Sequence, residues 1–332
     1  MPRTPRQPAT PLIRSFATAK RLKWSADNVY NAVGALNRLE AWLAARDSSL
    51  KVATTDDLNE YLGWRLDQVV PNTVIGERTH IRAFYRWASS GDDPYLARNP
   101  AKAVETIKGN DPDPDLTHVT AEWEYRALLA TCRRKTRDGG RRACDRRDAA
   151  IITLMWETGL RRAEVTRIEM RHIDWDAATI HLARTKGRTT TQSRDIDLGD
   201  EAMEAITRHV HDRGEHDGFL FESIGLRPGT TQRRPLAPNS IGLMLRRRAD
   251  EANATQQLPG KVRPVAHGFR RASTINDIDD GISARAIQHQ KGWNGDGRML
   301  GRYTRLAVKR QSLEEYRAKR GRRHLRAVDD VS

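Results

Sequence analysis

The sequence predicts a mainly α-helical protein of two domains, the second of which contains a small β-sheet. The length of 332 residues fits about two domains, at roughly 150 residues each. Hydrophobic residues recur at helical spacing along most of the chain. Apolar and polar residues alternate in two short runs, around residues 180 and 196, and these runs predict the strands.

The first domain is predicted to be all-helical and to span residues 25–105, after a disordered basic arm at residues 1–24. The arm contains six Lys or Arg residues, no acidic residue and four prolines. Thr54 or Thr55 should cap the helix TDDLNEYLGWRLDQ, Pro71 should precede a third helix, and Asn99-Pro100 closes the unit. The apolar face of the first helix consists of Val29, Val33, Leu36, Leu39 and Leu43.

A linker is predicted at residues 106–118, because the segment GNDPDPDLT is rich in proline and aspartate and cannot continue a helix. The second domain should then span residues 119–326. Ile180 and Leu182 alternate with polar residues, as do Ile196 and Leu198, so these two runs predict a β-hairpin. The remaining pattern predicts helices at 120–135, 146–158, 200–212, 238–252, 268–278 and 283–291, followed by short helices to the end.

The composition points to a polyanionic partner. Lys and Arg exceed Asp and Glu by fifteen, and the pI is about 10.2. Nucleic acid is the first candidate partner, and a merely soluble or ribosomal-style basic protein is the alternative. Cys132 and Cys144 lie among arginines without a His/Cys cluster, which argues against a zinc site or disulfides. The absence of a long apolar run and of a signal peptide predicts a soluble, cytoplasmic protein.

Four short stretches could carry chemistry, although each has an ordinary alternative. TGLRRAEVTRI places Arg161 at a helix junction, where Glu164 could orient it, although such an arginine is usually solvated. RTKGR places Lys186 at or near the hairpin turn, where lysine is commonly just exposed. VAHGFRRASTI puts His267 and Arg270 three residues apart on one helix face, near a helix N-terminus that favours an anion.

The fourth stretch, HQKGWNGDGRMLGRYTRL, contains Trp293 and, ten residues later, Tyr303. Both could be core aromatics. Arg302 and Arg305 flank the tyrosine, and apolar periodicity around it is poor, so a core position is disfavoured. The competing tyrosine, Tyr316, follows two glutamates, which would repel DNA and oppose formation of a phenolate.

Together these stretches resemble the tyrosine recombinase (phage integrase) family. The matching residues occur in the order and at the spacing of that family, and the match also covers the two-domain plan. The sequence departs from the usual pattern at KGW, where leucine-glycine-histidine is common, and at Phe269, where leucine is usual. The six matching residues are Arg161, Lys186, His267, Arg270, Trp293 and Tyr303.

The resemblance implies a helical, SAM-like core-binding domain and a mixed α/β catalytic domain with a C-terminal helix. It implies a site-specific DNA recombinase in which Tyr303 attacks phosphorus and forms a 3′-phosphotyrosyl intermediate. Arg161 and Arg270 would clamp the phosphate oxygens, His267 and Trp293 would add hydrogen bonds, and Lys186 would protonate the leaving oxygen. No metal, ATP or other cofactor is expected.

Double-stranded DNA is the expected partner, together with self-association into a tetramer on DNA, and a nucleoid location follows. A type IB topoisomerase and a non-catalytic DNA-binding protein that keeps the fold are the alternatives. Phosphate contacts are expected from the arginine-rich loop 133–147 and from an arginine run near residue 247. The arginines concerned are Arg133, Arg134, Arg141, Arg142, Arg246, Arg247 and Arg248.

Overall fold

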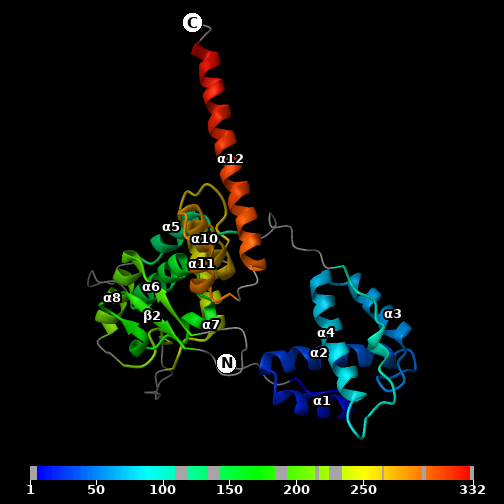
Figure 1. Ribbon diagram of the computed structural model, residues 1–332. Helices are drawn as coiled ribbons and strands as arrows, with labels where there is room; N and C mark the ends of the chain where they lie inside the picture. The colour runs from blue at the N-terminus through cyan, green and yellow to red at the C-terminus, as the bar shows by residue number, and fades with distance from the viewer. Residues whose placement is uncertain are drawn as a thin grey trace. The chain divides into compact units, whose positions relative to one another are not determined.

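The computed structural model divides the chain into two compact units, Met1–Asp113 and Pro114–Ser332 (Figure 1). The division lies within the segment 106–118 that was predicted as the linker. The structure describes residues 6–108, 118–133, 143–183, 193–213, 217–223, 234–263, 265–293 and 297–329.

The first unit is helical, as the sequence predicts. Ser25 caps α2, and Thr54 forms a capping box with Asp57 at the start of α3, so Thr54 rather than Thr55 is the cap. Its elements are α1 (Pro11–Arg21), α2 (Ala26–Ala44), α3 (Thr55–Leu66), α4 (Pro71–Ala88) and the 3₁₀ turn η1 (Pro100–Lys102).

The predicted disordered arm at residues 1–24 is wrong for residues 11–21, which form α1. Thr10 caps this helix, and Pro11 occupies its first turn, where a missing backbone N–H costs nothing. Ile13 and Phe16 are fully buried in the core of the unit, and Phe16 meets Phe84 of α4 edge to face at 5.4 Å between centroids. Burial of these side chains stabilises a segment that its prolines and charge alone would leave unfolded.

A buried carboxylate ties three helices of the first unit together. Glu77 of α4 accepts hydrogen bonds from Arg38 of α2 and from Arg65 and Tyr61 of α3, at 2.8 to 3.1 Å. Burial opposes the charge of Glu77, but the hydrogen bond from Arg65 and the charges of both arginines hold its pKa below the ordinary value. The polar network therefore fixes the relative position of α2, α3 and α4.

The second unit packs helices around α6, whose residues Ile151, Leu154 and Met155 are fully buried. α5, α8 and α10 contact α6, and the β-sheet lies at the edge of this helical group (Figure 1). The helices are α5 (Glu122–Ala130), α6 (Ala143–Thr158), α7 (Arg162–Val165), η3 (Met170–His172), α8 (Asp200–Arg213), α9 (Pro238–Thr255), α10 (Ala266–Asp279), α11 (Ala284–Lys291) and α12 (Arg298–Asp329).

The predicted β-hairpin is confirmed. β1 (Ile173–Asp174), β2 (Thr179–Leu182) and β3 (Arg194–Asp197) form an antiparallel sheet in the order β1-β2-β3. Ile180 and Ile196 face each other across β2 and β3, which buries the alternating apolar side chains on one face. Lys186 and the rest of residues 184–192 lie outside the described residues.

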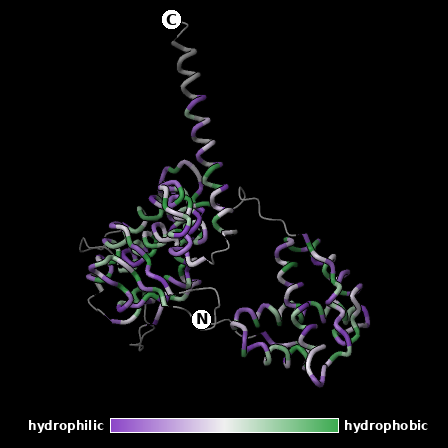
Figure 2. Tube along the Cα trace, viewed as in Figure 1, coloured by the Kyte–Doolittle hydropathy of each residue, from purple (hydrophilic) through white to green (hydrophobic). Residues whose placement is uncertain are grey.

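The C-terminal region forms one helix, α12, and not the several short helices that the sequence predicts (Figure 1). No proline occurs between residues 297 and 329, so every backbone N–H of this segment is available for helical hydrogen bonds. Hydrophilic residues predominate in its described outer part, whereas hydrophobic and hydrophilic residues alternate along the helices of both units (Figure 2). Within the part of the chain that the structure describes, no helix combines the length and apolar character needed to cross a bilayer.

Arg248, which was predicted to contact DNA phosphates, is instead part of the core. Its side chain is 2% exposed and donates to Asp145 and Asp148 of α6, with 2.6 Å contacts to both carboxylates. A further donor bonds to the carbonyl oxygen of Thr131 at 2.8 Å. A guanidinium that is buried among these acceptors cannot contact DNA, so that prediction is wrong, and its role is to tie α9 to α6.

We expect Asp148→Asn to destabilise the second unit by about 3–5 kcal/mol, because it leaves the buried charge of Arg147 without its counterion. Asp148 is fully buried and accepts from Arg147, Arg247 and Arg248. Urea unfolding followed by circular dichroism measures the change. Asp176→Asn, at an exposed position, is the matched control, and an unfolding curve for Asp148→Asn that overlays this control would contradict the structural role.

Candidate active site

The turn between α6 and α7 positions Arg161. α6 ends at Thr158, and Gly159 adopts a left-handed φ of +62°, which glycine tolerates best. A Cβ at this position would also approach the Cα of Arg270 to 3.2 Å, so both conformation and space favour glycine. Arg161 follows as the N-cap of α7, at the helix junction that the sequence predicts.

Glu164 orients Arg161, as its position three residues further on suggests. One carboxylate oxygen accepts the backbone N–H of Arg161 at 2.8 Å, and the other accepts from the Arg161 guanidinium at 3.1 Å. The Arg161 side chain remains 39% exposed, so it can still meet a ligand. Burial opposes the charge of Glu164, but the nearby Arg194 and the backbone bond from Arg161 hold its pKa below the ordinary value.

Arg270 is held more rigidly than Arg161. Its side chain lies in the first turns of α10, is 2% exposed, and donates to the carbonyl oxygens of Gly159, at 2.9 Å, and of Lys291. Burial, followed by the charge of Arg161, lowers its pKa to about 10. The group therefore remains a cation at neutral pH, fixed between the ends of α6 and α11.

His267 lies one turn before Arg270, beside the same cations, and is partly exposed to solvent. Burial, and then the charges of Arg271, Arg270 and Arg161, lowers the pKa of His267 to about 4. The imidazole is consequently neutral at physiological pH. It can offer one N–H donor to a phosphate oxygen and adds no charge.

We expect His267 to show no titration between pH 5.5 and 8 and to protonate only near pH 4. The folded pKa lies below the unfolded value of about 6.5, so His267 contributes stability above pH 6.5 that is lost as the pH falls toward 4. NMR of the imidazole, assigned with His267→Gln, measures this. Arg161→Gln should raise the value because it removes one nearby cation; a His267 resonance that titrates near pH 6.5 would contradict the arrangement.

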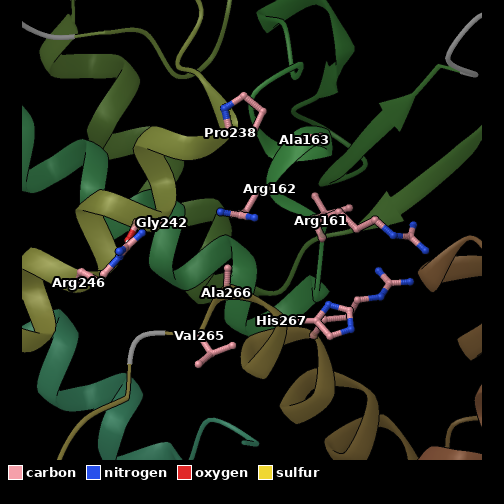
Figure 3. A pocket seen from close by; sticks show the side chains of 11 residues that line it. Arg161, Arg162, Ala163, Pro238, Gly242, Arg246, Val265, Ala266 and His267 are labelled. Atoms are coloured by element: carbon pink, nitrogen blue, oxygen red, sulfur yellow. The ribbon is translucent and has the colours of Figure 1, made fainter. Parts of the chain in front are cut away.

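Arg161, His267 and Arg270 line a single pocket of about 520 Å³ (Figure 3). The walls come from the start of α7, the first half of α9 and the first turns of α10. Four of the eleven lining residues are arginines, and none of these described residues carries a carboxylate. The complete lining is Leu160, Arg161, Arg162, Ala163, Pro238, Gly242, Arg246, Val265, Ala266, His267 and Arg270. Such a pocket favours a phosphate or another multivalent anion.

Trp293 and Tyr303 form an aromatic stack next to Arg270. Their rings lie 5.2 Å apart at 9°, and the Arg270 guanidinium lies 5.3 Å from the centroid of the Trp293 indole. Tyr303, in the second turn of α12, is 3% exposed. The poor apolar periodicity around it had argued against a core position, and that expectation is wrong. The phenol also interacts electrostatically with Arg270. The structure thus brings five of the six predicted residues into one region.

The predicted DNA-contacting arginines have mixed outcomes. Arg134, Arg141 and Arg142 lie outside the described residues, whereas Arg133 is exposed. Arg247 is 61% exposed and pairs with Asp148 at 2.8 Å, while Arg246 lines the pocket.

Sequence reasoning missed Arg194, which joins the parts of the site. This β3 residue has a side chain 2% exposed and donates to Glu164 at 3.0 Å and to the carbonyl oxygen of Gln290, at the end of α11, at 3.0 Å. Gly292 leaves room for it, since a Cβ there would lie 2.7 Å from one guanidinium nitrogen. Residues of β3 alternate between buried and exposed positions, and Arg194 stands on the same buried face as Ile196. This alternation was the sequence signal that could have identified Arg194 as buried.

Lys291 was also missed. Its buried ammonium contacts Asp277 at 2.8 Å and the carbonyl oxygen of Thr158 at 3.1 Å, and it donates to Ser273. Burial lowers its pKa, although Asp277 opposes the shift. The lysine of KGW thus anchors the end of α11, and with it Trp293, to α6 and α10.

We expect Arg194→Gln to lower the rate of DNA cleavage by about 10- to 100-fold while DNA affinity changes little, because misplacing reactive groups costs rate more than binding. If Arg194 acts through Glu164, its effect and that of Glu164→Gln should be non-additive in a double-mutant cycle. Arg171→Gln, at an exposed arginine paired with Glu169, is the control. Fully additive effects on the cleavage rate would show that Arg194 acts by another route.

Curated relatives support a common family. The chain is 23% identical over 282 residues to the tyrosine recombinase XerC of Lacticaseibacillus casei, covering 81% of this chain and 85% of the relative. It is 28% identical over 258 residues to the tyrosine recombinase XerD of Bifidobacterium longum, covering 76% and 78%.

Solved structures show the same fold. The Tn1549 transposon integrase in complex with circular intermediate DNA superimposes with a TM-score of 0.63 at 16% identity, covering 88% of this chain and 94% of that one. A lambda integrase dimer bound to a COC′ core site gives a TM-score of 0.63 at 16% identity, covering 88% and 75%.

The helical fold, the arginine-lined pocket and these relatives define a tyrosine-type site-specific recombinase. The model of the phage integrase family matches residues 118–310, which is more than half of the chain. The chain belongs to the phage integrase family.

Proposed function

We propose that the protein cuts and rejoins DNA strands through a covalent bond between Tyr303 and a 3′-phosphate. One observation carries this proposal. Arg161, His267 and Arg270 line a pocket in which no described lining residue is acidic, and the Trp293–Tyr303 stack lies against Arg270. A phosphodiester in that pocket would have cations on its oxygens and a phenol supplied from α12.

The bonds that form and break follow from these groups. The Tyr303 phenol releases its proton to water and its oxygen attacks phosphorus, while the bond from phosphorus to the 5′-oxygen breaks. Charge grows on the two non-bridging oxygens, which Arg161 and Arg270 stabilise. Neutral His267 donates one hydrogen bond. Lys186 is proposed to give its proton to the departing 5′-oxygen, and this assignment stays a prediction.

The same groups support rejoining. The phosphotyrosyl ester keeps the energy of the broken phosphodiester, so a 5′-hydroxyl can attack it and release Tyr303 without a separate energy source. When the attacking hydroxyl belongs to another duplex, the result is recombination. When it belongs to the original strand and the cut strand has rotated first, the result is relaxation of supercoils, which is the topoisomerase alternative. The family of the chain favours recombination.

Duplex DNA is the proposed substrate, and self-association into a tetramer on DNA is proposed for exchange between two duplexes. The net charge of +15 supports binding to a polyanion, and the solved relatives are integrases bound to DNA. Binding through phosphate contacts should weaken steeply with salt.

Covalent trapping tests the proposal. The substrate is a nicked duplex from which a short strand diffuses away after cleavage, so the protein–DNA ester cannot reverse. Denaturing gel electrophoresis should show an adduct that carries the strand on its 3′-phosphate and that disappears on protease digestion. Specific DNA binding without any adduct would support the non-catalytic alternative and refute the proposal.

A further inference from the structure

Two arginines of the pocket approach the same glycine from different helices. Arg246 of α9 donates to the carbonyl oxygen of Gly242, one turn earlier, at 3.4 Å. Arg162, at the start of α7, brings a guanidinium nitrogen so close to Gly242 that a Cβ there would lie 2.9 Å from it. Figure 3 shows the Arg162 and Arg246 side chains extending toward Gly242 from opposite sides. The two positive charges therefore lie in the same part of the pocket.

Within the part of the unit that the structure describes, neither charge has a counterion of the kind that other arginines have. Arg161 pairs with Glu164, Arg247 with Asp148, and Arg248 with both Asp145 and Asp148. For Arg162 and Arg246 no ion pair occurs with any described residue, and both are exposed. Like charges placed together without a carboxylate repel each other, and an anion bound between them removes that cost.

Arg162 and Arg246 line the same pocket as the candidate catalytic residues. Arg162 follows Arg161 directly, so the start of α7 supplies two guanidinium groups to the pocket. In Figure 3, Arg161 and His267 lie at one end, Arg246 lies at the other, and Arg162 lies between them. The pocket of about 520 Å³ is larger than one phosphate group requires.

We propose that Arg162 and Arg246 form a second anion site that binds a non-scissile phosphodiester of the DNA strand whose scissile phosphate meets Arg161, His267 and Arg270. The inference rests on the proposed function and deepens it. Two phosphates held at a fixed separation set the register of the strand. Phosphate contacts position DNA without reading its sequence. The pair thereby determines which phosphodiester of the strand faces Tyr303.

Salt-dependent binding measures the contacts without requiring chemistry. The affinity for a specific duplex is measured between 50 and 300 mM salt in the Tyr303→Phe background. Each of Arg162→Gln and Arg246→Gln should reduce the slope of log affinity against log salt by about 1. Arg208→Gln, an exposed arginine of α8 that pairs with Glu204 outside the pocket, is the matched control and should leave the slope unchanged. Slopes for both pocket variants equal to that control would overturn the proposal.

A chemical substitution then locates the phosphate. Single phosphates near the cleavage point are replaced by neutral methylphosphonates, and cleavage is measured for wild type and for Arg162→Gln. One non-scissile methylphosphonate should slow wild type about tenfold or more and have almost no further effect on the variant, because the contact is already lost. An identical interference pattern in both proteins would overturn the proposal, even if both bind DNA.

The outcomes separate this inference from the proposed function. If wild type forms no covalent adduct but the two arginine variants reduce the salt slope, the anion site stands and the proposed function fails. If the adduct forms while slopes and interference patterns match those of wild type, the proposed function stands and the anion site fails. Thermal melting of both variants should match that of Arg208→Gln, since the side chains are exposed and unpaired with described acidic residues.

Discussion

Tyr303→Phe is expected to abolish the covalent adduct with nicked DNA, while DNA affinity and thermal stability stay close to wild type. The phenyl ring keeps the stack on Trp293 at 5.2 Å, and only the oxygen that would attack phosphorus is removed. Because a nucleophile has no partial substitute, the loss should reach the detection limit of the gel assay. Retained adduct in this variant would show that another residue is the nucleophile.

Tyr316→Phe provides the matched control. Tyr316 belongs to the same helix as Tyr303, but it is 63% exposed and lies beyond the described contacts of the pocket. The same atom is removed in both variants, so differences in helix content or net charge cannot explain different outcomes. Adduct should form with Tyr316→Phe at the wild-type rate.

Arg161→Gln and Arg270→Gln are each expected to lower the cleavage rate by about 10²–10³-fold, because each removes a donor to charge that develops in the transition state. The two variants should differ in stability. Arg161 is 39% exposed and pairs with Glu164, so its loss should hardly change the melting temperature. Arg270 is 2% exposed and bonds to two carbonyl oxygens, so its loss should lower the melting temperature by several degrees.

Arg271→Gln separates these effects from a general loss of charge on α10. Arg271 is the neighbour of Arg270, but it bonds to the carbonyl oxygen of His118 and does not line the pocket. Cleavage should fall far less in this variant than in Arg270→Gln. Equal losses in rate for both variants would contradict a specific role for Arg270 in holding the phosphate.

Local sequence signals predicted much of the fold. The apolar spacing of α2, the Thr54 cap and the alternation of β2 and β3 depend on neighbours along the chain, so they could be recognised from the sequence. The helix α1 was missed because its stability comes from Ile13 and Phe16 packing against distant helices. The prolines and positive charges in and around this segment predicted disorder instead.

The candidate site could be predicted only where residue type and order were informative. His267 and Arg270 stood on one helix face, and the structure places them in one pocket with Arg161. Arg248 was misjudged because a run of three arginines gives no sign of which side chain points inward to Asp145 and Asp148. Arg194 was missed because its partners, Glu164 and Gln290, lie 30 and 96 residues away.

Peptide mapping of the trapped adduct tests the central claim most directly. After nuclease and trypsin digestion, mass spectrometry identifies the residue that retains the nucleotide. Trypsin cleaves after Arg302 and Arg305, so the expected modified peptide is Tyr303-Thr304-Arg305, with the nucleotide on the phenol oxygen. A nucleotide on Tyr316, or DNA cleavage that leaves no modified peptide at all, would contradict the assignment of Tyr303 as the nucleophile.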